Sequence, residues 1–225
     1  MALRRDSSYI APRLGGFGPW LAWKVRASIF KQLMEEYDPP HSWKVLDVGV
    51  TSDQTPDSNF FERLYPFPAS VTAVGLEDAS HLERDFPGLT FIKADGRSLP
   101  FPDRCFKLAF CSAVIEHVGS QAQQLQLIAE LARVAESTVL TTPNRYFPLE
   151  FHTLTPFLHW LPPRLFRRFL RLTGQHFFAE EANLNLLSER DVDRMLDSLG
   201  LRYQKKPYYL MGMKSNLVYH LSSST

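Results

Sequence analysis

Short apolar runs alternate along the chain with segments whose apolar positions recur at helical spacing. Five runs are expected to form buried strands, at residues 43–50, 71–76, 89–93, 106–114 and 137–141. The run at 106–114 is almost wholly apolar, as expected for a parallel strand that is covered on both faces. Helical periodicity is strongest over 20–37 and 121–134. This alternation predicts βαβ units and a mainly parallel sheet.

The last third of the chain departs from the alternation. Residues 142–187 are rich in aromatic side chains and proline and show no simple period. A helix is expected over 188–199, because Ser188 is a good N-cap and Gly200 a good helix stop. Two strand-like runs, 203–210 and 216–221, close the chain.

These elements are expected to form a single domain over residues 1–225. Residues 1–40 are its predicted N-terminal arm and helix, ended by two prolines. Residues 145–187 are the predicted insertion, or lid, over the site where a substrate enters. The length suits one α/β domain and is short for two.

The composition is that of a soluble globular protein, with 44% hydrophobic and 22% charged residues. The formal net charge of +1 gives no overall basic field for nucleic acid. No uncharged apolar stretch reaches the roughly 18 residues of a membrane span, and early glycines interrupt any signal peptide. Cys111 falls in an apolar run and is predicted to be a buried thiol. A reducing, cytoplasmic location is therefore expected.

Ligand-binding and catalytic residues are expected just after the strands, because open parallel sheets bind ligands at their carboxyl edge. The residues in question are Asp47, Gly49, Val50 and Thr51; Glu77 and Asp78; Asp95 and Gly96; Ser112, Ala113, Glu116 and His117; and Thr142, Pro143, Asn144 and Arg145.

Three segments resemble the motifs of class I S-adenosylmethionine-dependent methyltransferases, in particular the "methyltransferase type 11" branch. They read VLDVG at 45–49, ADGRSLPFPD at 94–103 and FCSAVIEHV at 110–118. The resemblance covers roughly residues 43–145. It implies an α/β, Rossmann-like fold of about seven strands with helices on both faces and the last strand antiparallel. It also implies S-adenosylmethionine as the cofactor.

The resemblance carries roles for the strand-end residues. Gly49 would let the backbone approach the cofactor, Glu77 would accept the ribose hydroxyls, and Asp95 would accept the adenine amino group. Asp47 would order the loop or meet the methionine end. The expected cofactor site comprises Asp47, Gly49, Val50, Thr51, Glu77, Asp78, Asp95, Gly96, Ser112, Ala113 and His117. Binding this cofactor needs no metal, and no metal site is expected.

Two positions depart from the family pattern. Thr51 stands where a second glycine is usual, and Gly75 stands where the acid after the second strand is usual. Glu77 follows two residues later, and Asp78 is the competing candidate for the ribose ligand. These departures favour the alternative of a methyltransferase-like partner or scaffold domain without catalysis. A nicotinamide enzyme is disfavoured because no G-x-G-x-x-G occurs.

On the acceptor side, His152 is the candidate general base, since it follows the fifth strand and histidine titrates near neutral pH. The alternative is a histidine that anchors an aromatic loop. Glu116 and His117 are expected to have a structural or cofactor-side role.

Residues 163–172 predict a basic amphipathic helix, with Arg164, Arg167, Arg168 and Arg171 on one side. It would either touch a membrane surface peripherally or recognise a lipid-linked, phosphate-bearing acceptor. The alternative is a lid helix whose arginines face water.

The predicted reaction transfers a methyl group to an oxygen or nitrogen of a small or lipid-linked acceptor. Nucleic acid is not an expected partner, because Thr142-Pro143-Asn144-Arg145 lacks the aromatic residue that stacks a flipped base.

Overall fold

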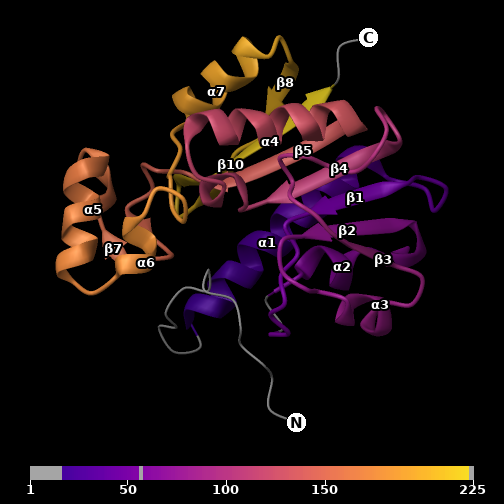
Figure 1. Cartoon of the computed structure of the whole chain (residues 1–225), viewed down its shortest axis with the longest axis horizontal. Coiled ribbons are helices and arrows are strands. Elements are labelled where there is room, and N and C mark those ends of the chain that lie inside the picture. Colours follow the sequence, from indigo (N-terminus) through magenta and orange to yellow (C-terminus); the bar gives the residue numbers. More distant parts are fainter. Residues whose placement is uncertain (1–16, 56–57, 223–225) are drawn as a thin grey trace.

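The computed structural model describes residues 17–55 and 58–222, with one mixed sheet as its largest element (Figure 1). Eight strands lie in the order β3-β2-β1-β4-β5-β10-β8, and β9 pairs with β10. The strands are β1 (Val45–Val48), β2 (Val71–Gly75), β3 (Thr90–Lys93), β4 (Phe106–Ser112), β5 (Ala135–Pro143), β8 (Arg202–Lys205), β9 (Tyr208–Leu210) and β10 (Met213–Ser222).

The register brings the carboxyl ends of the first strands to one edge. Val48 at the end of β1 pairs with Val74 on β2 and with Cys111 on β4, in parallel. The strand order reverses between β1 and β4, which makes this edge the switch point where ligands bind. β10 runs antiparallel to β5 and to β8. The predicted Rossmann-like fold is therefore confirmed, with the single run expected at 203–210 divided into β8 and β9.

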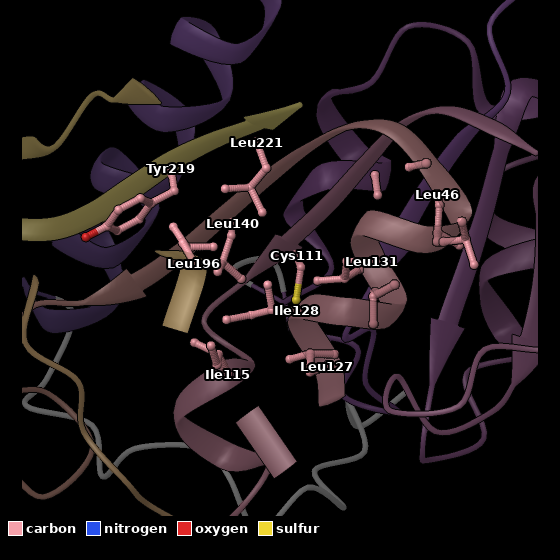
Figure 2. Packing of buried hydrophobic residues seen from close by; sticks show 14 of the residues in the cluster. Leu46, Cys111, Ile115, Leu127, Ile128, Leu131, Leu140, Leu196, Tyr219 and Leu221 are labelled. Carbon is pink, nitrogen blue, oxygen red and sulfur yellow. The ribbon is translucent and has the colours of Figure 1, made fainter. Parts of the chain in front are cut away.

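Helices cover both faces of the sheet. On one face lie α1 (Phe17–Tyr37), α2 (Phe60–Leu64) and α3 (His81–Asp85), and on the other α4 (Gln121–Val134) and α7 (Glu189–Ser198). Figure 2 shows Cys111 among the leucine and isoleucine side chains beneath α4. Cys111 has no exposed surface, so the predicted buried thiol is confirmed.

Polar residues cap both α4 and α7 at their N-termini, and the cap predicted at Ser188 is confirmed. Ser188 accepts from the Asp191 amide and the Asp191 carboxylate accepts from the Ser188 amide, a complete capping box at the start of α7. Ser120 and Gln123 form the same arrangement at α4. The helix expected from residue 20 begins at Phe17, and the arm before it lies outside the described residues.

The predicted insertion forms a small unit of its own after β5. It contains β6 (Leu149–Glu150), β7 (Thr155–Pro156), α5 (Pro163–Leu172) and α6 (His176–Ala179), which project beyond the sheet (Figure 1). Its own apolar cluster holds Phe166 and Leu170 of α5 against Phe178 and Leu184. Over 17–55 and 58–222, none of the helices has the length and apolarity that a bilayer crossing requires.

Candidate active site

The loop after β1 turns sharply over the end of β2. Gly49 has φ +118°, and the amides of Gly49 and Val50 both donate to the Val74 carbonyl, at 2.8 and 3.2 Å. A Cβ at position 49 would lie 2.1 Å from Cγ2 of Val114. Both the backbone conformation and the close packing therefore require glycine here.

Gly75, at the end of β2, is also required by close packing. A Cβ at this position would lie 2.3 Å from the carbonyl oxygen of Val50. The acid that the family usually carries here has no room while the loop keeps this course. The Val50 backbone thus occupies the space that the side chain of such an acid would need.

Glu77 reaches the loop after β1, whereas Asp78 does not. The Glu77 Oε2 atom accepts hydrogen bonds from the Ser52 amide at 3.1 Å and from its hydroxyl at 2.7 Å. Exposed Asp78 accepts from the Ser80 amide at 3.0 Å, which lowers the pKa of Asp78. Of the two competing acids, Glu77 is the one beside the predicted cofactor loop.

Thr51 contributes to the order of this loop. Its amide donates to Oδ1 of Asn59 at 2.9 Å, and its hydroxyl accepts from the Asp53 amide at 3.3 Å. Asn59 closes the loop by donating to the Thr51 carbonyl at 3.0 Å. A glycine at position 51 would lose the hydroxyl contact.

Asp47 lies inside the structure, on the face that α2 covers. It is buried beside buried Glu62, and burial raises the pKa of both carboxyls. The neighbouring Glu62 charge raises the pKa of Asp47 further. Two negative charges in this one buried site are therefore disfavoured, and Asp47 lies inside the fold just before the loop.

Asp95 and Gly96 follow β3 as predicted, but Asp95 already has a partner. Its carboxylate accepts from Nη2 of Arg97 at 2.6 Å, from Nε at 3.0 Å and from the Arg97 amide at 2.9 Å. These bonds hold the pKa of Asp95 below its usual value. At Gly96, a Cβ would lie 2.8 Å from Leu127 and 3.0 Å from Val48, so glycine permits the close approach of α4 and β1.

Ser112 and Ala113 end β4 beside β5. The two hydroxyls of Ser112 and Thr141 lie 2.8 Å apart, and the Ala113 amide donates to the Thr141 carbonyl at 2.9 Å. Ala113 has φ +55°, which turns the chain into the short helix at Ile115–His117. This turn directs His117 toward the insertion.

A buried histidine pair joins the end of β4 to the insertion. The Nε2 atoms of His117 and His152 lie 3.1 Å apart. His117 Nδ1 lies 2.7 Å from the Asn183 carbonyl oxygen, and His152 Nδ1 lies 2.7 Å from Oε1 of Glu150. Sequence reasoning did not single out Glu150, although its place two residues before His152 was a usable signal.

The histidine pair is electrostatically unequal. Burial lowers the pKa of His117 to about 3. Burial would also lower the pKa of His152, but the Glu150 carboxylate outweighs it and raises that pKa. Burial opposes ionisation of Glu150 as well, yet His152 brings the pKa of Glu150 down to about 2. His152 and Glu150 thus form a buried ion pair next to a neutral His117.

Glu116 lies beside this pair and is fully buried, which raises its pKa. Its Oε2 atom accepts from the Thr142 hydroxyl at 2.9 Å. Its Oε1 atom has no hydrogen-bond partner among the described residues and lies 4.0 Å from His117 Nε2.

The strand-end residues fit S-adenosylmethionine. A carboxylate offers about four acceptor positions, and both bonds from Ser52 fall on one oxygen of Glu77. Glu77 can therefore accept ribose hydroxyls. Asp95 can accept an adenine amino group once the partly exposed Arg97 side chain turns away. The glycine at position 49 keeps side-chain atoms out of the turn after β1, where a Cβ would meet Val114.

Comparison with known proteins finds similarity over the strands described above. Residues 46–139 match the family model described as "Methyltransferase domain". No protein of curated function matches the sequence.

Solved structures share the fold over most of the chain. Magnesium protoporphyrin IX methyltransferase of Synechocystis PCC 6803, with bound S-adenosylhomocysteine, is 12% identical with a TM-score of 0.60, covering 96% of this chain and 91% of that one. A protein of Pyrococcus horikoshii is 15% identical with a TM-score of 0.59, covering 90% and 91%. A Thermotoga maritima methyltransferase, described as a possible histamine N-methyltransferase, is 13% identical with a TM-score of 0.55, covering 91% and 92%.

At these identities the structures establish the fold, while the sequence match shows similarity to the methyltransferase domain family over residues 46–139. The match spans the strands that carry the predicted cofactor residues from β1 to β5. The expectations of a methyltransferase and of S-adenosylmethionine as its cofactor are confirmed at this level. Residues 46–139 thus match the methyltransferase domain family, within a chain that has the fold of S-adenosylmethionine-dependent methyltransferases.

Proposed function

We propose that the protein transfers a methyl group from S-adenosylmethionine to an oxygen or nitrogen of a small or lipid-linked acceptor. One observation carries this proposal: the cofactor loop after β1 and the buried His117–His152 network both meet the carboxyl edge of the sheet. The loop after β1 would bind the cofactor, and the His117–His152 network would line the place where the acceptor binds. We call these the cofactor half and the acceptor half of the site.

The reaction is a displacement at carbon. The cofactor supplies an electrophilic methyl group on a sulfonium; the sulfur–methyl bond breaks as the acceptor–methyl bond forms, and the acceptor loses its proton. Such a transfer requires chiefly in-line positioning and exclusion of water. In this chain Glu77 and Asp95 would bind the nucleoside, and the insertion would exclude water from the acceptor.

A small hollow lies between the insertion, the end of β5 and β10, beside Glu150 and with Arg145 on its wall. Its volume of about 10 Å³ suits a single water molecule, so it does not indicate the acceptor. The other lining residues are Pro143, Asn144, Phe147, Leu149, Phe151, His159, Leu186 and Ser215.

Helix α5 supports the lipid-linked form of the acceptor and peripheral contact with a membrane. Arg164 and Arg168 are exposed, as are Leu165 and Leu172 on the same helix. Phe157, Trp160 and Leu161 extend this surface with exposed apolar side chains. Against it, Arg167 pairs with Glu181 at 3.1 Å and Arg171 with Glu180 at 3.2 Å, which reduces the positive charge available to lipid.

The general base predicted at His152 would need a ring nitrogen that faces the acceptor. In the structure Nδ1 faces Glu150 and Nε2 faces His117. His152 could act as a base only at Nε2, with His117 displaced. Because methyl transfer from a sulfonium does not require a base, the proposed reaction does not depend on this role.

Mass spectrometry of cell extracts incubated with the protein and methyl-deuterated cofactor tests the proposal. A labelled small molecule or lipid that requires active protein supports it. The double variant Glu77→Gln/Asp95→Asn is the matched control and should give no label. Tight cofactor binding without labelling of any compound would favour a non-catalytic partner instead.

A second assay addresses the membrane. Co-sedimentation with vesicles containing anionic lipid should fall when salt is raised and in Arg164→Gln/Arg168→Gln. Binding that is indifferent to anionic lipid and to salt would reject the surface role of α5.

A further inference from the structure

We propose that Glu116, His117 and His152 bind one divalent transition-metal ion between the end of β4 and the insertion. One ligand atom from each residue lies within 4.8 Å of the other two. Glu116 and His117 come from the turn after β4, and His152 from the insertion, so the ion would also join these parts.

The hydrogen bonds of the two rings determine which nitrogens face each other. His117 Nδ1 is turned to a carbonyl oxygen and His152 Nδ1 to a carboxylate, and both acceptors require an N–H. The two Nε2 atoms face each other 3.1 Å apart. Without a metal ion, the proton of the charged His152 ring lies between them, and once that proton leaves both atoms present lone pairs. Two lone pairs at this distance repel unless a proton or a cation lies between them. A metal ion satisfies both at once.

The spacing agrees with metal coordination. Zinc–nitrogen bonds of about 2.0–2.1 Å at tetrahedral angles place neighbouring ligand atoms about 3.3 Å apart. The two Nε2 atoms meet this spacing, while Glu116 Oε1 lies 4.0 Å from His117 Nε2. An approach of about 1 Å would bring this oxygen into coordination distance.

Glu116 gives a second, independent indication. Its Oε1 atom is buried without a hydrogen-bond partner among the described residues, while Thr142 holds Oε2. A buried carboxylate oxygen with no donor is costly. Coordination of a cation would remove that cost.

The surroundings have the form of an outer coordination shell. Metal-bound histidines usually donate their other N–H to a carboxylate or a backbone carbonyl, which orients the ring. Glu150 does this for His152, and the Asn183 carbonyl for His117. Glu150 is itself fixed by the amide and hydroxyl of Thr153, at 2.6 and 2.5 Å.

Two imidazoles with one carboxylate suit zinc, cobalt, iron or nickel rather than magnesium or calcium, which prefer oxygen ligands. Three protein ligands would leave a coordination position open. If the proposed methyl transfer holds, an acceptor hydroxyl could bind there and lose its proton more readily. That consequence rests on the proposed function, whereas ion binding does not.

The test uses the full chain after chelator treatment, titrated with Zn²⁺ by calorimetry and with Co²⁺ by visible absorption. One ion should bind per chain. His152→Gln and Glu116→Gln should lose more than about 100-fold in affinity, and Glu150→Gln, an outer-shell change, about 10–100-fold. His220→Gln is the matched control, because His220 is a buried histidine on β10 stacked on Tyr37, away from this site.

Glu116→Gln keeps the shape of the side chain, so it remains informative if His152→Gln fails to fold. The proposal is overturned if folded wild-type protein binds neither ion, or if Glu116→Gln and His152→Gln bind as the wild type does. Cofactor binding measured on the same samples separates this result from the proposed function. Loss of one with retention of the other identifies which proposal fails.

Discussion

The carbonyl oxygen of Val50 lies over Gly75, where a side-chain carbon would come within 2.3 Å of it. The loop after β1 and the end of β2 therefore determine each other's shape. Position 75 is a glycine and lacks the acid that the family usually has there. The nearest acid that contacts the loop is Glu77, which accepts hydrogen bonds from the Ser52 amide and hydroxyl.

Restoring the usual acid should therefore harm the site. Gly75→Asp is expected to weaken S-adenosylmethionine binding and to destabilise the fold by about 1–3 kcal/mol, because the new side chain collides with the Val50 backbone. Denaturant unfolding and calorimetry measure the two effects. Leu76→Asp is the control, since Leu76 is 60% exposed. Tighter cofactor binding by Gly75→Asp would contradict the assignment.

Substitution of the two acids after β2 should show which of them binds the cofactor. Glu77→Gln removes the charge that accepts from Ser52 and should reduce cofactor affinity about 10–100-fold, since hydrogen bonds to charged groups contribute about 1.5–3 kcal/mol. Asp78→Asn should leave the affinity unchanged, because Asp78 is exposed and bonds to Ser80. The reverse order of effects would transfer the ribose role to Asp78.

Arg97 should compete with the cofactor for Asp95. The pair is partly exposed, so breaking it costs about 0.2–1 kcal/mol. Arg97→Gln is thus expected to raise S-adenosylmethionine affinity by about 2–5-fold, while Asp95→Asn lowers it. Calorimetric titration of both variants decides the matter. Weaker binding in Arg97→Gln would mean that Arg97 contacts the cofactor itself.

Glu150 should make stability depend on acid pH. Its pKa falls from 4.5 to about 2 on folding, so the unfolded chain binds more protons over this range. The stabilisation it provides is complete above about pH 4.5 and is lost as the pH falls toward 2. Glu150→Gln should be less stable at pH 7 by a few kcal/mol, because a pKa difference of one unit corresponds to about 1.4 kcal/mol. Its free energy of unfolding should also fall less steeply as the pH is lowered into the acid range (the acid limb).

Denaturant unfolding at a series of pH values from neutral into the acid range measures this dependence. Glu180→Gln serves as the control, since Glu180 forms an exposed ion pair with Arg171, and such pairs contribute little. An acid limb of wild-type slope in Glu150→Gln would show that the His152 pairing does not stabilise the fold.

The sheet and the helices α4 and α7 could be predicted because their signals are local: apolar periodicity for α4 and the Ser188 cap for α7. Apolar runs predicted the strands from β1 to β5, and Ser188 predicted the start of α7. The strand-end positions of Glu77, Asp95 and Gly96 followed from the same runs.

Other parts of the site depend on contacts between distant segments. No local pattern indicates that the Val50 backbone lies over Gly75. The burial of Asp47 beside Glu62 and the ion pair between Arg97 and Asp95 are equally absent from the sequence pattern. His117 and His152 lie 35 residues apart and meet only through the insertion, whose aromatic sequence has no simple period. The sequence therefore located the cofactor half of the site better than the acceptor half.

Calorimetric titration of the folded protein with S-adenosylmethionine tests the cofactor site most directly. We expect one molecule to bind per chain, with affinity lost in Glu77→Gln/Asp95→Asn while both proteins unfold at similar denaturant concentrations. Absence of binding by folded wild-type protein, or equal binding by the double variant, would contradict the site described at the ends of β1, β2 and β3.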